Sequence, residues 1–217
     1  MPDIGPSAAV GQRALLEQLL SDGCVRRSAY LLAAGVRAQA LADAVRAGIV
    51  VRAAPGAYHL PMAGRPSARL AIAVACARSS RATVCMLSAA YLCGLVDAPP
   101  VLTWLALPVG AHAPKHGGLP ERILRWSHAG AFGEGVVTDE LCGVTLRRTD
   151  APRTVVDLLR YARYLGEDDA GLHAGARYVR QGGDPAALLK VAERLATPAS
   201  TMRRLTSAVQ EWQGIYA

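Results

Sequence analysis

The chain has 217 residues, of which 52% are hydrophobic and only 5% aromatic, so its core must be built mostly from alanine, valine and leucine. Basic residues outnumber acidic residues by 24 to 17, and the resulting net charge of +7 favours polyanionic partners. The apolar runs are too short for a membrane-spanning protein, and the five cysteines lack the spacing of a disulfide framework or a zinc site.

Three short helices and a hairpin are predicted in the first sixty residues. A leucine stripe marks the first helix, and Gly23, Gly35 and Gly48 end the three helices in turn. The turn Pro55-Gly56 joins two short strands. The predicted elements are helices at residues 7–22, 26–34 and 37–47, followed by strands at residues 49–53 and 57–60.

After a linker rich in proline and glycine at residues 61–66, short strands are mixed with helices. Ser88, Asp150 and Asp184 are positioned to cap three of these helices. Residues 110–120 combine Gly, Pro and His and predict a loop. The predicted elements are helices at residues 67–79 and 88–95, strands at 101–107, 121–127, 136–138 and 143–148, helices at 151–164 and 167–180, and two more that open at Pro185 and Pro198.

Three helices followed by a hairpin is the order of a winged helix-turn-helix, whose third helix enters the major groove while the hairpin reaches the backbone beside it. We therefore predict an α+β fold, with a winged helix-turn-helix over residues 7–62 and a mixed α/β domain over residues 67–217 that ends in several helices. Residues 23–52 contain five arginines and one acid, Asp43, which is the excess of positive charge that phosphate binding requires.

The predicted DNA contacts follow from side-chain chemistry. Arg37 and Gln39 are expected to read base edges, because arginine pairs well with guanine and glutamine with adenine. The ring of Tyr58 is expected to pack against the third helix and leave its hydroxyl for a phosphate. The alternative is that the arginines are ordinary solvated faces of a small domain. The arginines predicted to contact phosphates are Arg26, Arg27, Arg46 and Arg52.

A second group of arginines lies in the predicted C-terminal domain. Arg153 and Asp157 are four residues apart on one helix, a spacing typical of a structural ion pair that anchors the first turn. The functional alternative is a surface for a partner protein or an auxiliary contact with DNA. The residues assigned to that possible surface are Arg147, Arg148, Arg153, Arg160 and Arg163.

Four stretches carry a resemblance to a known family. The run VRRSAYLLAAGVRAQALADAVRAGIVVRAAPGAYHLP resembles the N-terminal domain of AbiEi-type antitoxins and transcriptional regulators. The runs MLSAAYLCGL and GVTLRRTDAPRTVVDLLRY, and the tail DPAALLKVAERLATPASTMRRLTSAVQEW, are similar to later parts of that family. The order and spacing of the four stretches, over residues 20–212, carry the resemblance more than any one of them.

This resemblance implies an antitoxin from a bacterial toxin–antitoxin or phage-defence system. Such a protein counters a nucleotidyltransferase-like toxin, in several cases without a stable complex. Its winged domain binds double-stranded DNA at inverted repeats in its own promoter and represses it, while the domain after the linker carries the antitoxin role. We expect a cytoplasmic protein, monomeric or weakly dimeric, with no membrane partner.

Enzyme activity is not expected. The sequence has no GxSxG, no Walker loop and no dinucleotide fingerprint, so neither a catalytic residue nor a cofactor is assigned. His112, His116 and Cys142 lack a supporting carboxylate nearby, so no metal is assigned either. Two classes remain: a DNA-binding antitoxin that represses its own promoter, and a one-component regulator whose C-terminal domain binds a small molecule. The first predicts a flat basic surface in that domain, and the second predicts a pocket.

Overall fold

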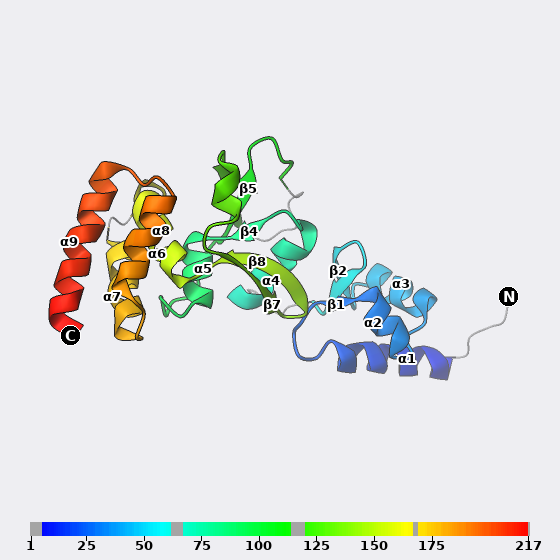
Figure 1. The fold of residues 1–217 in the computed structure, drawn as a ribbon. Coiled ribbons are helices and arrows are strands. Elements are labelled where there is room, and N and C mark those ends of the chain that lie inside the picture. Colours follow the sequence, from blue (N-terminus) through cyan, green and yellow to red (C-terminus); the bar gives the residue numbers. More distant parts are fainter. Residues whose placement is uncertain (1–5, 62–66, 114–119, 167–168, 217) are drawn as a thin grey trace. The chain divides into compact units, whose positions relative to one another are not determined.

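The structure, a computed structural model, describes residues 6–61, 67–113, 120–166 and 169–216 (Figure 1). These residues form an α+β fold with nine α-helices and two sheets, which confirms the predicted fold class. The chain divides into two compact units. The first unit contains residues 1–80, 114–119 and 140–146, and the second unit contains residues 81–113, 120–139 and 147–217. Most of the predicted linker and of the predicted loop at 110–120 lies outside the described residues.

The first unit contains the predicted helices and hairpin of the N-terminal region. Its core is formed by leucines and valines that include Leu16, Leu20, Leu31 and Val50. Three strands form an antiparallel sheet in the order β1-β3-β2. The elements are α1 (Pro6–Leu19), β1 (Arg26–Arg27), α2 (Ser28–Ala33), α3 (Ala38–Arg46), β2 (Val51–Ala54), β3 (Ala57–His59) and α4 (Ala68–Arg78).

The start of the second helix was predicted wrongly. Arg26 and Arg27 form strand β1 instead of the first helical turn, because they pair with Tyr58 and Ala57 of β3. The N–H of Ser28 then donates to the carbonyl of Gly56 at 2.8 Å, at the turn between β2 and β3. The hairpin therefore has a third strand, and α2 begins only at Ser28.

The second sheet has the strand order β6-β5-β4-β8-β7. Strand β4 pairs antiparallel with β5 and parallel with β8, and β5 pairs parallel with β6. The predicted strands of this region are confirmed, and a short one is added at residues 83–84. The strands are β4 (Thr83–Val84), β5 (Thr103–Pro108), β6 (Glu121–Trp126), β7 (Val136–Leu141) and β8 (Val144–Thr149).

Helices complete the second unit, and two of them begin at the predicted caps. Asp150 accepts a hydrogen bond from the N–H of Arg153 at 2.9 Å, and Asp184 accepts one from the N–H of Ala186 at 2.8 Å. Ser88 does not cap a helix, because it is buried inside one and accepts a hydrogen bond from the N–H of Trp104. The helices are α5 (Met86–Leu92), α6 (Ala151–Arg160), α7 (Ala170–Arg180), α8 (Pro185–Arg194) and α9 (Ala199–Tyr216), with 3₁₀ turns η1 (Ala129–Phe132) and η2 (Ala162–Tyr164).

Helices α7 and α9 meet where Gly175 faces the ring of Trp212. A methyl group on Gly175 would lie 2.2 Å from the nearest ring carbon, which is far inside van der Waals contact. We expect Gly175→Ala to lower the free energy of unfolding by about 1–3 kcal/mol, because the buried ring must move. The matched control is Gly214→Ala in α9, where a methyl group meets nothing within 4 Å and the better helix propensity should stabilise. Urea unfolding compares the stability of the two variants, and higher stability in both would contradict the close contact between Gly175 and Trp212.

Candidate nucleic-acid interface

A tight turn joins α2 to α3 and fixes the start of α3. Gly35 adopts a φ of +95°, which residues with a side chain rarely adopt, and Val36 is buried after it. The N–H of Val36 donates to the carbonyl of Leu31 at 3.0 Å and closes the end of α2. Arg37 then has an extended backbone and precedes the first turn of α3.

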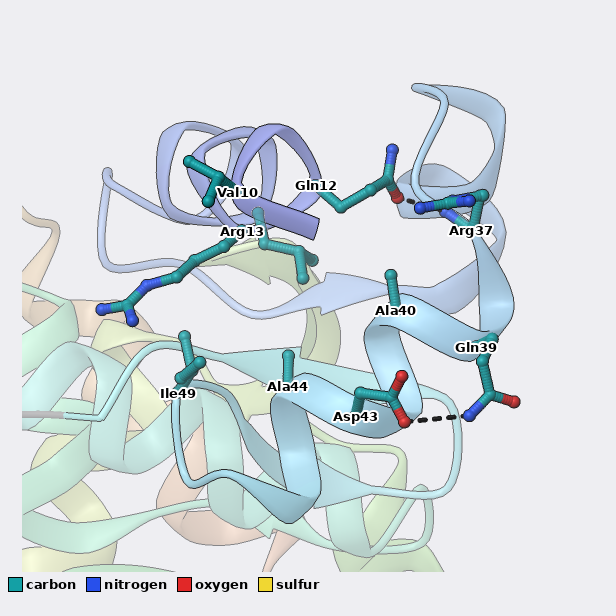
Figure 2. Close-up of a pocket in the computed structure, with 10 residues that line it drawn as sticks. Val10, Gln12, Arg13, Arg37, Gln39, Ala40, Asp43, Ala44 and Ile49 are labelled. Carbon is teal, nitrogen blue, oxygen red and sulfur yellow. Dashed lines mark hydrogen bonds between the residues drawn. The ribbon is translucent and has the colours of Figure 1, made fainter. Parts of the chain in front are cut away.

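Helix α1 holds this turn through Gln12. The Oε1 atom of Gln12 accepts a hydrogen bond from the N–H of Arg37 at 2.7 Å, and its Nε2 donates to the carbonyl of Gly35 at 3.2 Å. Figure 2 shows Gln12 reaching Arg37 beside the start of α3. This role of Gln12 was not predicted. The spacing of residues could have indicated it, because Gln12 lies one helical turn before Leu16 and therefore on the same inward face of the helix as Leu16 and Leu20.

The outer face of α3 is polar. Leu41 and Ala44 are buried on its inner face, while Gln39, Asp43 and Arg46 are exposed. The Nε2 of Gln39 donates to Oδ1 of Asp43 at 2.9 Å, as Figure 2 shows, and Arg46 forms an ion pair with the same carboxylate. Asp43 therefore aligns an amide and a guanidinium along one exposed face of the helix.

The three-stranded sheet brings two more predicted contacts together. Arg26 of β1 and Arg52 of β2 both lie opposite Tyr58 of β3, so the three side chains share one face. Tyr58 is half-buried and packs against the core of the first unit, and Arg52 is exposed. Arg26 is less available than predicted, because it forms an ion pair with Asp22 and its side chain is only 26% exposed.

A cavity of about 460 Å³ lies between α1 and α3 (Figure 2). Its walls combine the apolar Val10, Ala40 and Ile49 with polar side chains of α3. Arg37 and Gln39 both line this cavity, so the two residues predicted to read bases lie beside the same cavity.

Arg27 is also exposed, and it lies on β1 instead of α2. The structure thus leaves Arg27, Arg37, Gln39, Arg46 and Arg52 exposed on one small domain.

The arginines of the second unit do not form the predicted common surface. Arg147 and Arg148 follow each other on β8, so their side chains point to opposite faces of the sheet. Arg147 donates to the carbonyl of Phe132, and Arg148 forms an ion pair with Asp139 at 2.6 Å. Arg163 is exposed and stacks on the ring of Tyr164, while Arg160 is mostly covered.

Arg153 cannot belong to a surface, because its side chain is fully buried. Its Nε donates to Oδ2 of Asp157 at 2.8 Å, which confirms the predicted structural ion pair along α6. Arg160 also pairs with Asp157 at 3.3 Å. Burial raises the pKa of the Asp157 carboxyl above its usual value, and attraction from Arg153 and then Arg160 opposes the rise.

The described parts of the chain contain no group of three or more His, Cys, Asp or Glu side chains that would hold a metal ion. His116 lies outside those parts. All five cysteines are free. The pKa of the Cys24 thiol is raised to about 11, mainly by burial and next by the neighbouring Cys142.

Within the described residues, every helix is too short or too polar to pass through a lipid bilayer.

Comparison with known proteins shows a likeness in fold. No family model matches the chain, and no curated protein matches it. Among solved structures, the chain is similar to the crystal structure of the RV2827C protein from Mycobacterium tuberculosis. The two share 16% sequence identity and a TM-score of 0.60, over 93% of this chain and 76% of the other. At this identity the likeness concerns the fold, and it agrees with an α+β architecture.

Proposed function

We propose that the first unit is a winged helix-turn-helix that binds double-stranded DNA. The observation that carries the proposal is the exposed polar face of α3, which follows a tight turn and lies in the same small domain as a three-stranded sheet with exposed arginines. In proteins of this plan the helix after the turn enters the major groove, and the hairpin lies along the neighbouring backbone. Helix α3 and the β2–β3 hairpin are the corresponding elements here.

The side chains divide into two roles. Arg37 and Gln39 lie at the N-terminal end of α3, where residues reach base edges when the helix enters the groove. Arg46 lies at the other end of α3, and Arg52 and Arg27 lie on the sheet, where phosphate contact suits them. Such contacts add affinity for any sequence and make binding dependent on salt.

The biological role we propose is that of an antitoxin that represses its own promoter. The resemblance of four stretches to AbiEi-type antitoxins supports this role, and it implies inverted repeats as the binding site and a nucleotidyltransferase-like toxin as the protein countered. Co-expression with the product of the neighbouring gene tests the antitoxin part separately from DNA binding. Growth that stops whether or not this chain is present would remove the antitoxin role and leave the DNA-binding proposal standing.

We call the exposed residues Arg27, Arg37, Gln39, Arg46 and Arg52 the DNA face. Its two proposed roles, base readout and phosphate contact, are separable by mutation. We expect Arg37→Ala to weaken binding to the chain's own upstream region by about 10-fold to 100-fold and to erase its preference over scrambled DNA. Arg52→Ala should weaken binding to both DNAs alike and reduce the slope of log affinity against log salt by about 1. Gel shifts over a salt series, with scrambled competitor, measure both effects.

The control is Arg180→Ala, which removes an exposed arginine of the second unit and should leave binding unchanged. Equal losses on specific and scrambled DNA for both Arg37→Ala and Arg52→Ala would show that the roles are assigned wrongly. An absence of preference in the unsubstituted protein at every salt concentration would remove sequence-specific DNA binding itself.

A further inference from the structure

The second unit contains a cavity of about 480 Å³ where β6, η1, α6 and α8 come together. This volume lies within the range of about 300–1,000 Å³ that small-molecule sites occupy. Arginines and aromatic side chains dominate its functional groups. The lining residues that matter for its chemistry are Arg125, Trp126, His128, Arg160, Tyr161 and Arg194.

Three arginines belong to the cavity lining, and they come from three separate elements. Arg125 of β6 donates to the carbonyls of Pro108 and Ala111, which fix the group without neutralising its charge. Arg160 of α6 donates to the carbonyl of Leu195 at 3.3 Å. Arg194 of α8 is 65% exposed and pairs with Glu134, whose carboxylate also lines the cavity.

A fourth guanidinium lies buried behind the wall. Arg153 stacks on the ring of Trp126 at 4.6 Å, and its Nη1 donates to the carbonyls of Ala131 and Glu134. Those three residues all line the cavity. Within the described residues, Nη2 of Arg153 and Nε1 of Trp126 are buried and have no hydrogen-bond partner. Buried donors without partners are rare in folded proteins and are typical of places where a ligand or water completes the site.

The charges around the cavity do not balance. Arg153 and Arg160 share the single carboxylate of Asp157, and Arg194 has Glu134, while Arg125 is paired with carbonyls alone. Asp150 also interacts with Arg153 and Glu134, so four arginines face three carboxylates in and directly behind the wall. The excess of positive charge suits an anionic ligand such as a phosphate monoester, which carries about −1.5 to −2 at neutral pH.

We propose that this cavity binds a small organic phosphate monoester of about the size of a mononucleotide. Planar guanidinium groups bind phosphate oxygens in pairs, which favours phosphate over a single carboxylate. The remaining volume and the ring of Tyr161 accommodate the organic part. All of the lining residues belong to the second unit, so the ligand gives that unit a binding activity of its own, as the one-component regulator alternative predicts.

Isothermal titration of the full chain with AMP tests the proposal, with adenosine and inorganic phosphate as comparison probes. AMP should bind, inorganic phosphate should bind more weakly, and adenosine should not bind. Arg125→Gln and Arg194→Gln should each weaken AMP binding about tenfold, because each removes a charged hydrogen bond. Neither residue belongs to the buried Arg153–Asp157 pair, and urea unfolding confirms that each variant is folded.

Two control variants locate the site. Arg180→Gln removes an exposed arginine of α7 outside the cavity, and Arg37→Ala removes one on the DNA face, so both should bind AMP as the unsubstituted protein does. A failure of AMP to bind at millimolar concentration would overturn the proposal. So would binding of AMP that Arg125→Gln and Arg194→Gln leave unchanged, or binding of adenosine as tight as that of AMP.

Discussion

Asp157→Ala is expected to lower the free energy of unfolding by about 3–5 kcal/mol. The carboxylate of Asp157 and the guanidinium of Arg153 are both fully buried. Removing the carboxylate leaves the buried positive charge of Arg153 with carbonyl partners but without its ion-pair partner, and Arg160 loses its ion pair as well. Urea unfolding followed by circular dichroism measures the loss.

The comparison variant is Asp97→Ala, which breaks a two-bond ion pair with Arg177 at the surface. Water solvates both charges there, so we expect a much smaller loss than for Asp157→Ala. The double variant Arg153→Met/Asp157→Leu removes both buried charges together and should recover most of the stability lost in Asp157→Ala. A loss for Asp157→Ala no larger than for Asp97→Ala would mean that the pair is solvated.

A triple variant of the DNA face should lose nearly all DNA binding while it remains folded. We expect Arg37→Ala/Arg46→Ala/Arg52→Ala to weaken binding to the chain's own upstream region by about a thousandfold, since each arginine contributes about 1–3 kcal/mol there. All three side chains are exposed, so the unfolding midpoint in urea should not change appreciably. Fluorescence anisotropy with a labelled duplex at low salt measures the affinity.

A charge-matched variant tests whether DNA affinity depends on this face or only on the net charge of the protein. Arg163→Ala/Arg180→Ala/Arg203→Ala also removes three exposed arginines, all from the second unit. It lowers the net charge by the same amount and should leave most of the DNA affinity in place. Similar losses in the two triple variants would show that binding follows net charge, with no defined interface on α3 and the hairpin.

Local signals in the sequence were sufficient to predict most elements. Asp150 and Asp184 cap the helices that they were expected to cap, and the turn at Pro55-Gly56 joins the two strands of the hairpin. Strand β1 was missed because two residues carry no periodicity of their own. Arg26 and Arg27 become a strand only through pairing with β3, which lies about thirty residues further along the chain.

The candidate sites differ in how far the sequence predicts them. The DNA face is local, since α3 and the hairpin are close in sequence and their arginines lie on exposed faces. The cavity of the second unit is not local, because its lining comes from three separate segments, at residues 125–134, 160–161 and 194–196. Burial of Arg153 had no local signal, since Val155, Val156, Leu158 and Leu159 lie on one face of α6, while Arg153 lies on the opposite, polar face. Its carbonyl partners at Ala131 and Glu134 lie too far away in sequence to be inferred.

The first unit is discontinuous in the chain, and this limits how it can be exchanged as a module. Residues 140–146 belong to it, and the N–H of Val25 donates to the carbonyl of Cys142 at 2.9 Å. A methyl group on Gly143 would lie 2.3 Å from the carbonyl oxygen of Val25, so the two backbones touch. A gene fusion that transfers residues 1–80 alone therefore leaves this backbone contact behind. Recombination between relatives should preserve the fold of the first unit only when residues 140–146 are inherited together with residues 1–80.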